Sequence, residues 1–175
     1  MNSITLLQPP RIVFGNGCAI QSAEFLAQRG AKRVLLVTSK SVRPQIESII
    51  VALKKSGAEI VEGKFIPAEP TLNFFETALA EVRASQIDSV LAIGGGSVID
   101  VAKLFAALAD SPQKIQDVFG INLLTSRKLM LVCLPTTAGT GAEVSPNAIL
   151  LDEANELKKG VVSPHLIPDA AHSHP

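Results

Sequence analysis

The sequence predicts an α/β fold in which a mostly parallel sheet is covered by helices on both faces. Short runs of apolar and β-branched residues, as buried parallel strands require, recur along the chain. Segments with apolar residues at helical spacing separate these runs. The 175 residues, 47% of them hydrophobic and 18% charged, suffice for one domain with a buried core. Alternating strands and helices in one domain favour parallel strands joined by crossover helices.

In chain order, the first half of the sequence alternates helix and strand. Apolar residues recur at helical spacing from Ala19 to Arg29, and Gly30 can end that helix. Gly57 ends a second helix in the same way, and Thr71 is a favourable N-cap for a third. The expected elements are a helix at 19–29, a strand at 34–38, a helix at 41–55, a strand at 59–63 and a helix that starts at Thr71.

The second half contains the two most apolar strand candidates. One of them leads directly into three consecutive glycines, and a helical pattern follows. The other precedes two apolar segments that flank a polar turn, which is typical of a β-hairpin. The expected elements are a strand at 89–93, a helix at 97–109, a strand at 129–134 and hairpin strands at 147–151 and 159–162.

The composition argues against several classes of function. Lys and Arg number 16, Asp and Glu also 16, and Trp and Tyr are absent, so neither nucleic acid nor a membrane surface is an expected partner. The N-terminus lacks a signal-peptide pattern, and no apolar run is long enough to span a membrane. Cys18 and Cys133 lie far apart in apolar surroundings, which favours two buried thiols over a disulfide. We therefore expect a soluble, cytoplasmic protein.

The first candidate site is the triple glycine between a strand and a helix. Gly94, Gly95 and Gly96 have no Cβ atoms, so the backbone can turn sharply and a phosphate can approach it closely. The amide groups at the start of the following helix favour such an anion, and Ser97 can cap the helix or donate its hydroxyl to a phosphate. A plain strand-to-helix turn remains an open alternative, because the spacing is not the usual G-x-G-x-x-G.

The second candidate site is the segment at 135–145, which also follows a buried strand directly. Four hydroxyl side chains and two glycines in this segment predict a polar loop that a ligand can approach. Ligands bind at the carboxyl ends of strands in open α/β sheets, so both loops are expected at the same edge. A long capped turn without a ligand is the alternative interpretation.

Four motifs together resemble the iron-containing, or group III metal-dependent, alcohol dehydrogenases. They are GGGSVIDVAK at 94–103, PTTAGTGAEVS at 135–145, KKGVVSPHLIPDAA at 158–171 and PPRIVFGNG at 9–17. The resemblance implies a Rossmann-like, dehydroquinate synthase-like N-terminal domain that binds NAD or NADP. It also implies that residues 1–175 form a single NAD(P)-binding domain, and that a C-terminal helical domain with the Fe or Zn ligands is absent from this chain.

The resemblance implies a hydride transfer between the nicotinamide and a primary or secondary alcohol or aldehyde. No catalytic residue and no metal ligand is expected within this chain, so the chain alone is expected to be inactive. A non-catalytic nucleotide-binding or assembly module is the alternative. The resemblance assigns cofactor contacts to Gly94, Gly95, Gly96, Ser97, Asp100, Thr136, Thr137, Thr140, Ser145 and Lys158. Asp100 and Lys103, three residues apart on the helix, are expected to be able to pair.

The end of the predicted strand at 34–38 departs from the family pattern. NAD-selective members often carry Asp where Ser39 stands, and that carboxylate would repel a 2′-phosphate. Ser39 is thus a further cofactor-binding candidate, and Lys40 adds a nearby cation, so NADP is expected to be accepted as well as NAD. The alternative is that Ser39 only caps the following helix.

Two further departures concern Glu69 and the C-terminal tail. Glu69 stands where the family often has Asn, which makes one cofactor contact doubtful. His172 and His174 alternate, so in an extended segment they would point the same way and offer a weak metal site. A frayed or altered terminus without a metal is the other interpretation.

The chain is also expected to form a homo-oligomer. The apolar stretch 144–151, with apolar residues at 161–167, is a candidate exposed patch, and residues 4–13 and the hairpin offer strand edges. The alternative is that these residues fold back onto their own sheet.

Overall fold

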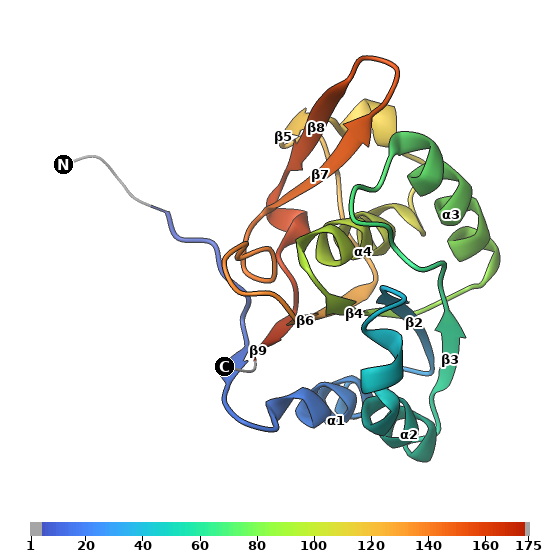
Figure 1. The fold of residues 1–175 in the computed structure, drawn as a ribbon, viewed down its shortest axis with the longest axis vertical. Helices are drawn as coiled ribbons and strands as arrows, with labels where there is room; N and C mark the ends of the chain where they lie inside the picture. Colours follow the sequence, from blue (N-terminus) through green and yellow to red (C-terminus); the bar gives the residue numbers. More distant parts are fainter. Residues whose placement is uncertain (1–4, 174–175) are drawn as a thin grey trace.

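The computed structural model describes residues 5–173. Its main sheet has six strands in the order β1–β9–β6–β4–β2–β3, and every neighbouring pair is parallel. The strands are β1 (Ile12–Phe14), β2 (Arg33–Thr38), β3 (Glu59–Glu62), β4 (Ser89–Gly94), β6 (Met130–Pro135) and β9 (Ala170–Ser173). Figure 1 shows the sheet seen nearly along its edge.

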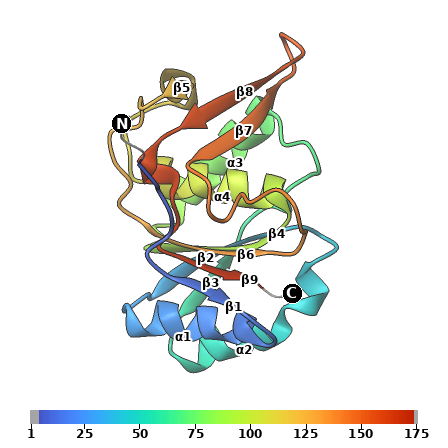
Figure 2. The same ribbon diagram turned by 90° about the vertical axis from the view of Figure 1, so that its left-hand side faces the viewer.

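Helices cover both faces of this sheet, as the sequence predicts. The helices α1 (Gln21–Gln28) and α2 (Glu47–Lys55) lie on one face, and α3 (Leu72–Ala84) and α4 (Gly96–Leu108) lie on the other (Figure 2). The strand side chains alternate accordingly: Val34 and Leu36 pack with α1 and α2, whereas Leu35 and Val37 pack with α3 and α4. Both faces of the central strands are therefore buried, which explains their unbroken apolar sequences.

A second, smaller sheet lies over α4, on its far side from the main sheet (Figure 2). It contains β5 (Gly120–Ile121), β7 (Asn147–Asp152) and β8 (Leu157–Val162), and β7 and β8 form the predicted antiparallel hairpin. The short 3₁₀ turns are η1 (Cys18–Ile20), η2 (Arg43–Gln45), η3 (Ile115–Val118) and η4 (Pro164–Leu166).

The helix predicted over 41–55 is wrong at its start. Residues 43–45 form the separate 3₁₀ turn η2, and α2 begins only at Glu47. Pro44 explains the break, because proline favours the first positions of a helical turn and cannot donate a hydrogen bond within one. Thr71, by contrast, caps α3 as predicted, and its hydroxyl accepts a bond from the Phe74 amide at 3.2 Å.

The prediction of an exposed patch around 144–151 is wrong for most of its residues, because they are not exposed. Ala148 and Leu150 of β7 pack beneath the hairpin against α4, and Val161 and Leu166 are fully buried with them. The hairpin therefore closes over its own apolar face, and only Ile149 of these remains exposed. Within residues 5–173, no helix is long and apolar enough to cross a membrane.

The C-terminal segment forms a strand rather than a frayed end as far as it is described. His172 lies on β9, is only 2% exposed, and places Nδ1 3.2 Å from the carbonyl oxygen of Cys18. Its Nε2 is buried without a hydrogen-bond partner, and burial lowers the pKa of this imidazole. His174 lies outside the described residues, so the two-histidine metal site is not tested.

Candidate functional site

The crevice at the carboxyl edge of the sheet lies between β2 and β4. The chain leaves β2 towards α2 on one face and leaves β4 towards α4 on the other, so the two connections diverge. Such a divergence opens a crevice in which ligands of open α/β sheets bind. The Thr38 hydroxyl ties the strand ends together by donating to the Ile93 carbonyl at 2.7 Å.

At the three glycines at the end of β4, lack of space rather than an unusual backbone angle disfavours a side chain, most strongly at Gly94. A Cβ atom at Gly94 would lie 2.6 Å from the Val98 side chain, which no real packing allows. A Cβ at Gly95 would lie 3.3 Å from Thr137 Oγ1, and one at Gly96 would lie 3.1 Å from the Thr140 methyl carbon. The glycine turn and the hydroxyl-rich loop are thus in close contact, as expected for two loops at one edge.

The second loop, residues 136–145, starts from a fixed point and then becomes exposed. Thr136 donates its amide to the Gly94 carbonyl at 3.0 Å, which joins the two loops at their bases. Residues 136–140 are exposed, and Gly139 and Gly141 adopt φ angles of +112° and +61°. Glycine is favoured at these two positions because other residues rarely adopt positive φ.

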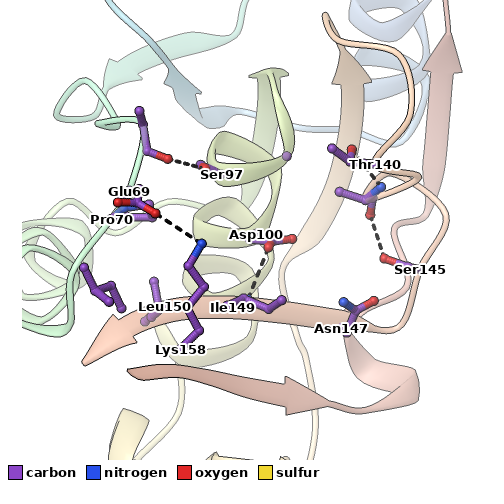
Figure 3. Close-up of a pocket in the computed structure, with 14 residues that line it drawn as sticks. Glu69, Pro70, Ser97, Asp100, Thr140, Ser145, Asn147, Ile149, Leu150 and Lys158 are labelled. Carbon is purple, nitrogen blue, oxygen red and sulfur yellow. Dashed lines mark hydrogen bonds and ion pairs between the residues drawn. The ribbon is translucent and has the colours of Figure 1, made fainter. Parts of the chain in front are cut away.

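Three cavities surround these loops, and the predicted cofactor residues line them. A cavity of about 690 Å³ is lined by Ser39, Gly95, Gly96, Ser97 and Thr137. A second, of about 280 Å³, is lined by Ser97, Asp100, Thr140, Ser145 and Lys158, together with Gly96 (Figure 3). A third, of about 1060 Å³, includes Thr136, Thr137 and His172. All the predicted positions except Gly94 therefore line one of three neighbouring cavities, which share the lining residues Gly96, Ser97 and Thr137.

The prediction that Ser97 caps α4 is wrong. The helix begins one residue earlier, with Gly95 in the extended conformation as its N-cap, so Ser97 lies in the first turn. The Ser97 hydroxyl donates instead to the carbonyl of Ala68 at 2.6 Å. No side chain caps the first amides of α4, which leaves them available to an anion at the glycine turn.

The predicted pairing of Asp100 with Lys103 is also wrong. Asp100 accepts a bond from the Ile149 amide at 3.2 Å, and its partial burial raises the pKa to about 6. Lys103 is fully buried and donates to the carbonyls of Ser145, at 2.7 Å, and Asn147, at 3.0 Å. Burial lowers the pKa of its ammonium group. Asp100 and Lys103 therefore make hydrogen bonds to different residues of the segment 145–149, which joins the second loop to β7.

Ser39 directly follows β2 and lines the 690 Å³ cavity. Its hydroxyl is 3.1 Å from that of Ser41, and no side chain caps the following turn η2, so the helix-cap interpretation of Ser39 is not supported. Lys40 is exposed and lines the same cavity.

Lys158 and Glu69 come together across the 280 Å³ cavity. Lys158 extends from β8, and its Nζ lies 3.1 Å from Oε1 of Glu69 in the segment before α3 (Figure 3). Asn147 and Ile149 line the same cavity, although sequence reasoning did not single them out. No local motif marks these two residues, because only the folding of the hairpin over α4 brings them here.

The described residues offer no obvious metal centre. Among residues 5–173, no group of three or more His, Cys, Asp or Glu side chains lies in an arrangement that holds a metal ion. The donor set that an iron or zinc site requires is thus not assembled from this part of the chain.

Together, the parallel sheet, the crevice and the glycine-lined edge define a Rossmann-like α/β domain. Comparison with known proteins leads to a specific family. The family model described as iron-containing alcohol dehydrogenase matches residues 9–175, and the chain belongs to this family. The chain corresponds to the N-terminal part of these proteins.

Individual relatives agree with this assignment. The chain is 33% identical over 156 residues to a mitochondrial hydroxyacid-oxoacid transhydrogenase of Caenorhabditis elegans, covering 85% of this chain and 34% of that protein. It is 32% identical over 170 residues to an alcohol dehydrogenase of Thermococcus barophilus, covering 92% of this chain and 44% of that protein. The chain thus spans less than half the length of these curated relatives.

Solved structures share the fold over nearly the whole chain. The NADH-dependent butanol dehydrogenase A of Thermotoga maritima superimposes with a TM-score of 0.90 at 29% identity, covering 100% of this chain and 45% of that one. The sulfoacetaldehyde reductase of Bifidobacterium kashiwanohense, solved in complex with NAD⁺, gives a TM-score of 0.85 at 26% identity, covering 100% and 47%.

Proposed function

We propose that this chain binds NAD(H) or NADP(H) at the carboxyl edge of its sheet. The observation that carries the proposal is the glycine turn at the uncapped start of α4, where Gly95 and Gly96 face Thr137 and Thr140 so closely that an added Cβ would lie 3.3 Å and 3.1 Å from them. A side chain at either glycine would fill the space where a pyrophosphate can approach the backbone. The positive end of the helix dipole favours the same anion.

The residues of the edge divide into three roles in this proposal. The backbone at 94–97 holds the pyrophosphate, and Thr136, Thr137, Thr140 and Ser145 orient the adenine and nicotinamide sides. Lys158 adds a cation within reach of a phosphate, and Asp100 lies on the same cavity wall. When bound, the nicotinamide supplies a carbon that accepts or donates a hydride.

For a protein of the relatives' full length that contains this domain, we propose hydride transfer between the nicotinamide and a primary or secondary alcohol or aldehyde. The printed names of the relatives, alcohol dehydrogenase and butanol dehydrogenase among them, support this class of reaction. The family is described as iron-containing, but the described residues do not assemble a ligand set, so we assign no step to a metal here. We accordingly expect no turnover of alcohols by the 175-residue chain alone.

We propose relaxed selection between the two cofactors. Ser39 presents a neutral hydroxyl at the end of β2, and the exposed Lys40 lies beside it on the same cavity. No carboxylate at position 39 repels a 2′-phosphate, so NADP(H) is accepted at least as well as NAD(H).

We also propose a homo-oligomer and a cytoplasmic location. The β1 edge supports self-association, because Ile12 is 50% exposed and Phe14 is 71% exposed on a strand that pairs only with β9 among the described residues. The free, buried thiols of Cys18 and Cys133 fit a reducing compartment. Light scattering over a concentration series tests the first proposal: a chain that stays monomeric at about 100 μM would contradict it.

The proposal of cofactor binding is tested by calorimetry on the folded chain. We expect weak but saturable binding of NADH or NADPH at millimolar concentration, and loss of that binding in Gly95→Val. Gly160→Val is a matched control, because a Cβ at Gly160 meets no atom closer than 3.9 Å and the residue lines none of the three cavities. No binding by the folded wild type, or equal binding by Gly95→Val, would overturn the proposal.

A further inference from the structure

The segment 67–70, which leads from β3 towards α3, makes two polar contacts across the proposed pyrophosphate site. The Ser97 hydroxyl donates to the Ala68 carbonyl at 2.6 Å, and Lys158 Nζ lies 3.1 Å from Glu69 Oε1 (Figure 3). Lys158 is the cation that the proposed function places within reach of a phosphate, and Ser97 belongs to the backbone segment that holds the pyrophosphate. Both donors are therefore already engaged by one short segment of the chain.

The charges on the 280 Å³ cavity do not favour an anionic ligand by themselves. Glu69, Asp100 and Lys158 line it, which gives two carboxyl groups and one ammonium group. Burial raises the pKa of Asp100 to about 6, so this carboxyl is still mostly ionised at pH 7. The Glu69 carboxylate offsets the charge of Lys158, so the one ammonium group on this cavity is not free to attract a pyrophosphate.

The contact between Glu69 and Lys158 is of a kind that a ligand can displace. Both side chains are largely exposed, at 64% and 63%. Exposed ion pairs contribute little to stability because water solvates both groups when they separate. The pyrophosphate of the cofactor, which carries two negative charges in all, offers Lys158 a stronger partner at about the same place.

We propose that Glu69 is an affinity-determining residue of the cofactor site that competes with the cofactor phosphate for Lys158. In the free chain the Glu69 carboxylate pairs with the ammonium group of Lys158, and this ion pair breaks when the dinucleotide binds. This inference rests on the proposed function, since it assumes that the dinucleotide occupies the cavity. Removing the Glu69 charge leaves Lys158 free in advance and strengthens binding.

NADH fluorescence is a suitable probe, because the reduced nicotinamide is excited at wavelengths that protein side chains do not absorb. We compare the wild-type chain with Glu69→Gln, Lys158→Gln and the double variant. We expect Glu69→Gln to bind NADH about two- to fivefold more tightly, with a smaller gain at high salt. Lys158→Gln is expected to bind more weakly, and the double variant to bind like Lys158→Gln.

The double variant separates competition from simple repulsion. If Glu69 acts by occupying Lys158, its removal changes nothing once Lys158 is gone. Glu81→Gln is the matched control, because it removes the same charge from an exposed ion pair with Lys64. Glu81 lies on α3, and neither residue lines any of the three cavities. Its affinity for NADH is expected to equal that of the wild type.

Several outcomes overturn the inference. Equal or weaker binding by Glu69→Gln does so, as does an equal gain in Glu81→Gln or a gain that persists in the Lys158→Gln background. In each of these cases the wild type still binds NADH, so the proposed function survives. Absence of NADH binding in all the folded proteins overturns both.

Discussion

The two loops of the candidate site use glycine for different reasons. In the first loop, residues 94–97, the glycines have ordinary φ angles, and the neighbouring Val98 leaves no room for a Cβ at Gly94. In the second loop, residues 136–145, a Cβ added at Gly139 would meet no atom within 4 Å, but the φ of +112° disfavours any other residue. The first loop is limited by packing, and the second by backbone conformation.

This difference indicates how the two loops act on a ligand. The first loop continues from β4 into α4 within the main core, so its amides have a fixed direction. The second loop is exposed over 136–140 and is held at its far end by the buried Lys103, which binds the carbonyls of Ser145 and Asn147. We infer that the first loop binds a phosphate through amides of fixed direction. The second loop, anchored at both of its ends, lies opposite.

The largest expected effect comes from a methyl group at Gly94. Gly94→Ala places a Cβ about 2.6 Å from the Val98 side chain, and we expect a loss of about 3 kcal/mol in the free energy of unfolding. Gly139→Ala adds the same methyl group in open space and costs only the strain of its φ, about 1 kcal/mol. Urea unfolding measures both, and the reverse order would contradict the distinction between the two loops.

A somewhat smaller effect is expected from removing the anchor of the second loop. Lys103→Met keeps the length of the side chain but leaves the Ser145 and Asn147 carbonyls without their donor, at a cost of about 2 kcal/mol. Amide hydrogen exchange should rise over 140–147 while the glycine turn stays protected. Lys64→Met, in an exposed pair with Glu81, serves as the control and should change little. Equal loss of protection in both loops would show that they are not held independently.

The smallest expected effect concerns selection between NADH and NADPH, which lies outside both loops. Ser39→Asp introduces a carboxylate at the end of β2, and we expect the ratio of the two affinities to shift towards NADH by about fivefold, or roughly 1 kcal/mol. Ser39→Asn adds a side chain of similar size without the charge and should leave the ratio nearly unchanged. A wild type that already prefers NADH strongly, with no response to Ser39→Asp, would remove Ser39 from the site.

The sequence was sufficient to predict the central strands and the meeting of the two candidate loops at one edge of the sheet. The apolar runs that end at Gly94 and Pro135 mark β4 and β6, and their neighbouring carboxyl ends bring the two loops together as predicted. The strand β9 was not predicted, and β1 was expected only as a strand edge within 4–13, because three or four residues carry too little pattern and these strands depend on pairing with each other.

Side-chain partners were predicted less well than backbone positions. Ser97 has the chemistry of a helix cap, yet it finds the Ala68 carbonyl, 29 residues away in the chain. Lys103 does not pair with Asp100, its near neighbour on α4, because the segment at the start of β7 places two carbonyl groups within its reach. These choices depend on contacts between distant segments, and local sequence spacing carries no information about them.

The most direct measurement of the central claim is a titration of the isotope-labelled chain with NADH, followed residue by residue through its amide NMR signals. If the dinucleotide lies at the carboxyl edge, the amides of Gly95, Gly96 and Ser97 shift first, together with those of Thr137 and Thr140 in the facing loop. Signals of α1 and of the β1 edge stay in place. Saturable shifts confined to other parts of the chain, with the glycine turn unaffected, would contradict the account.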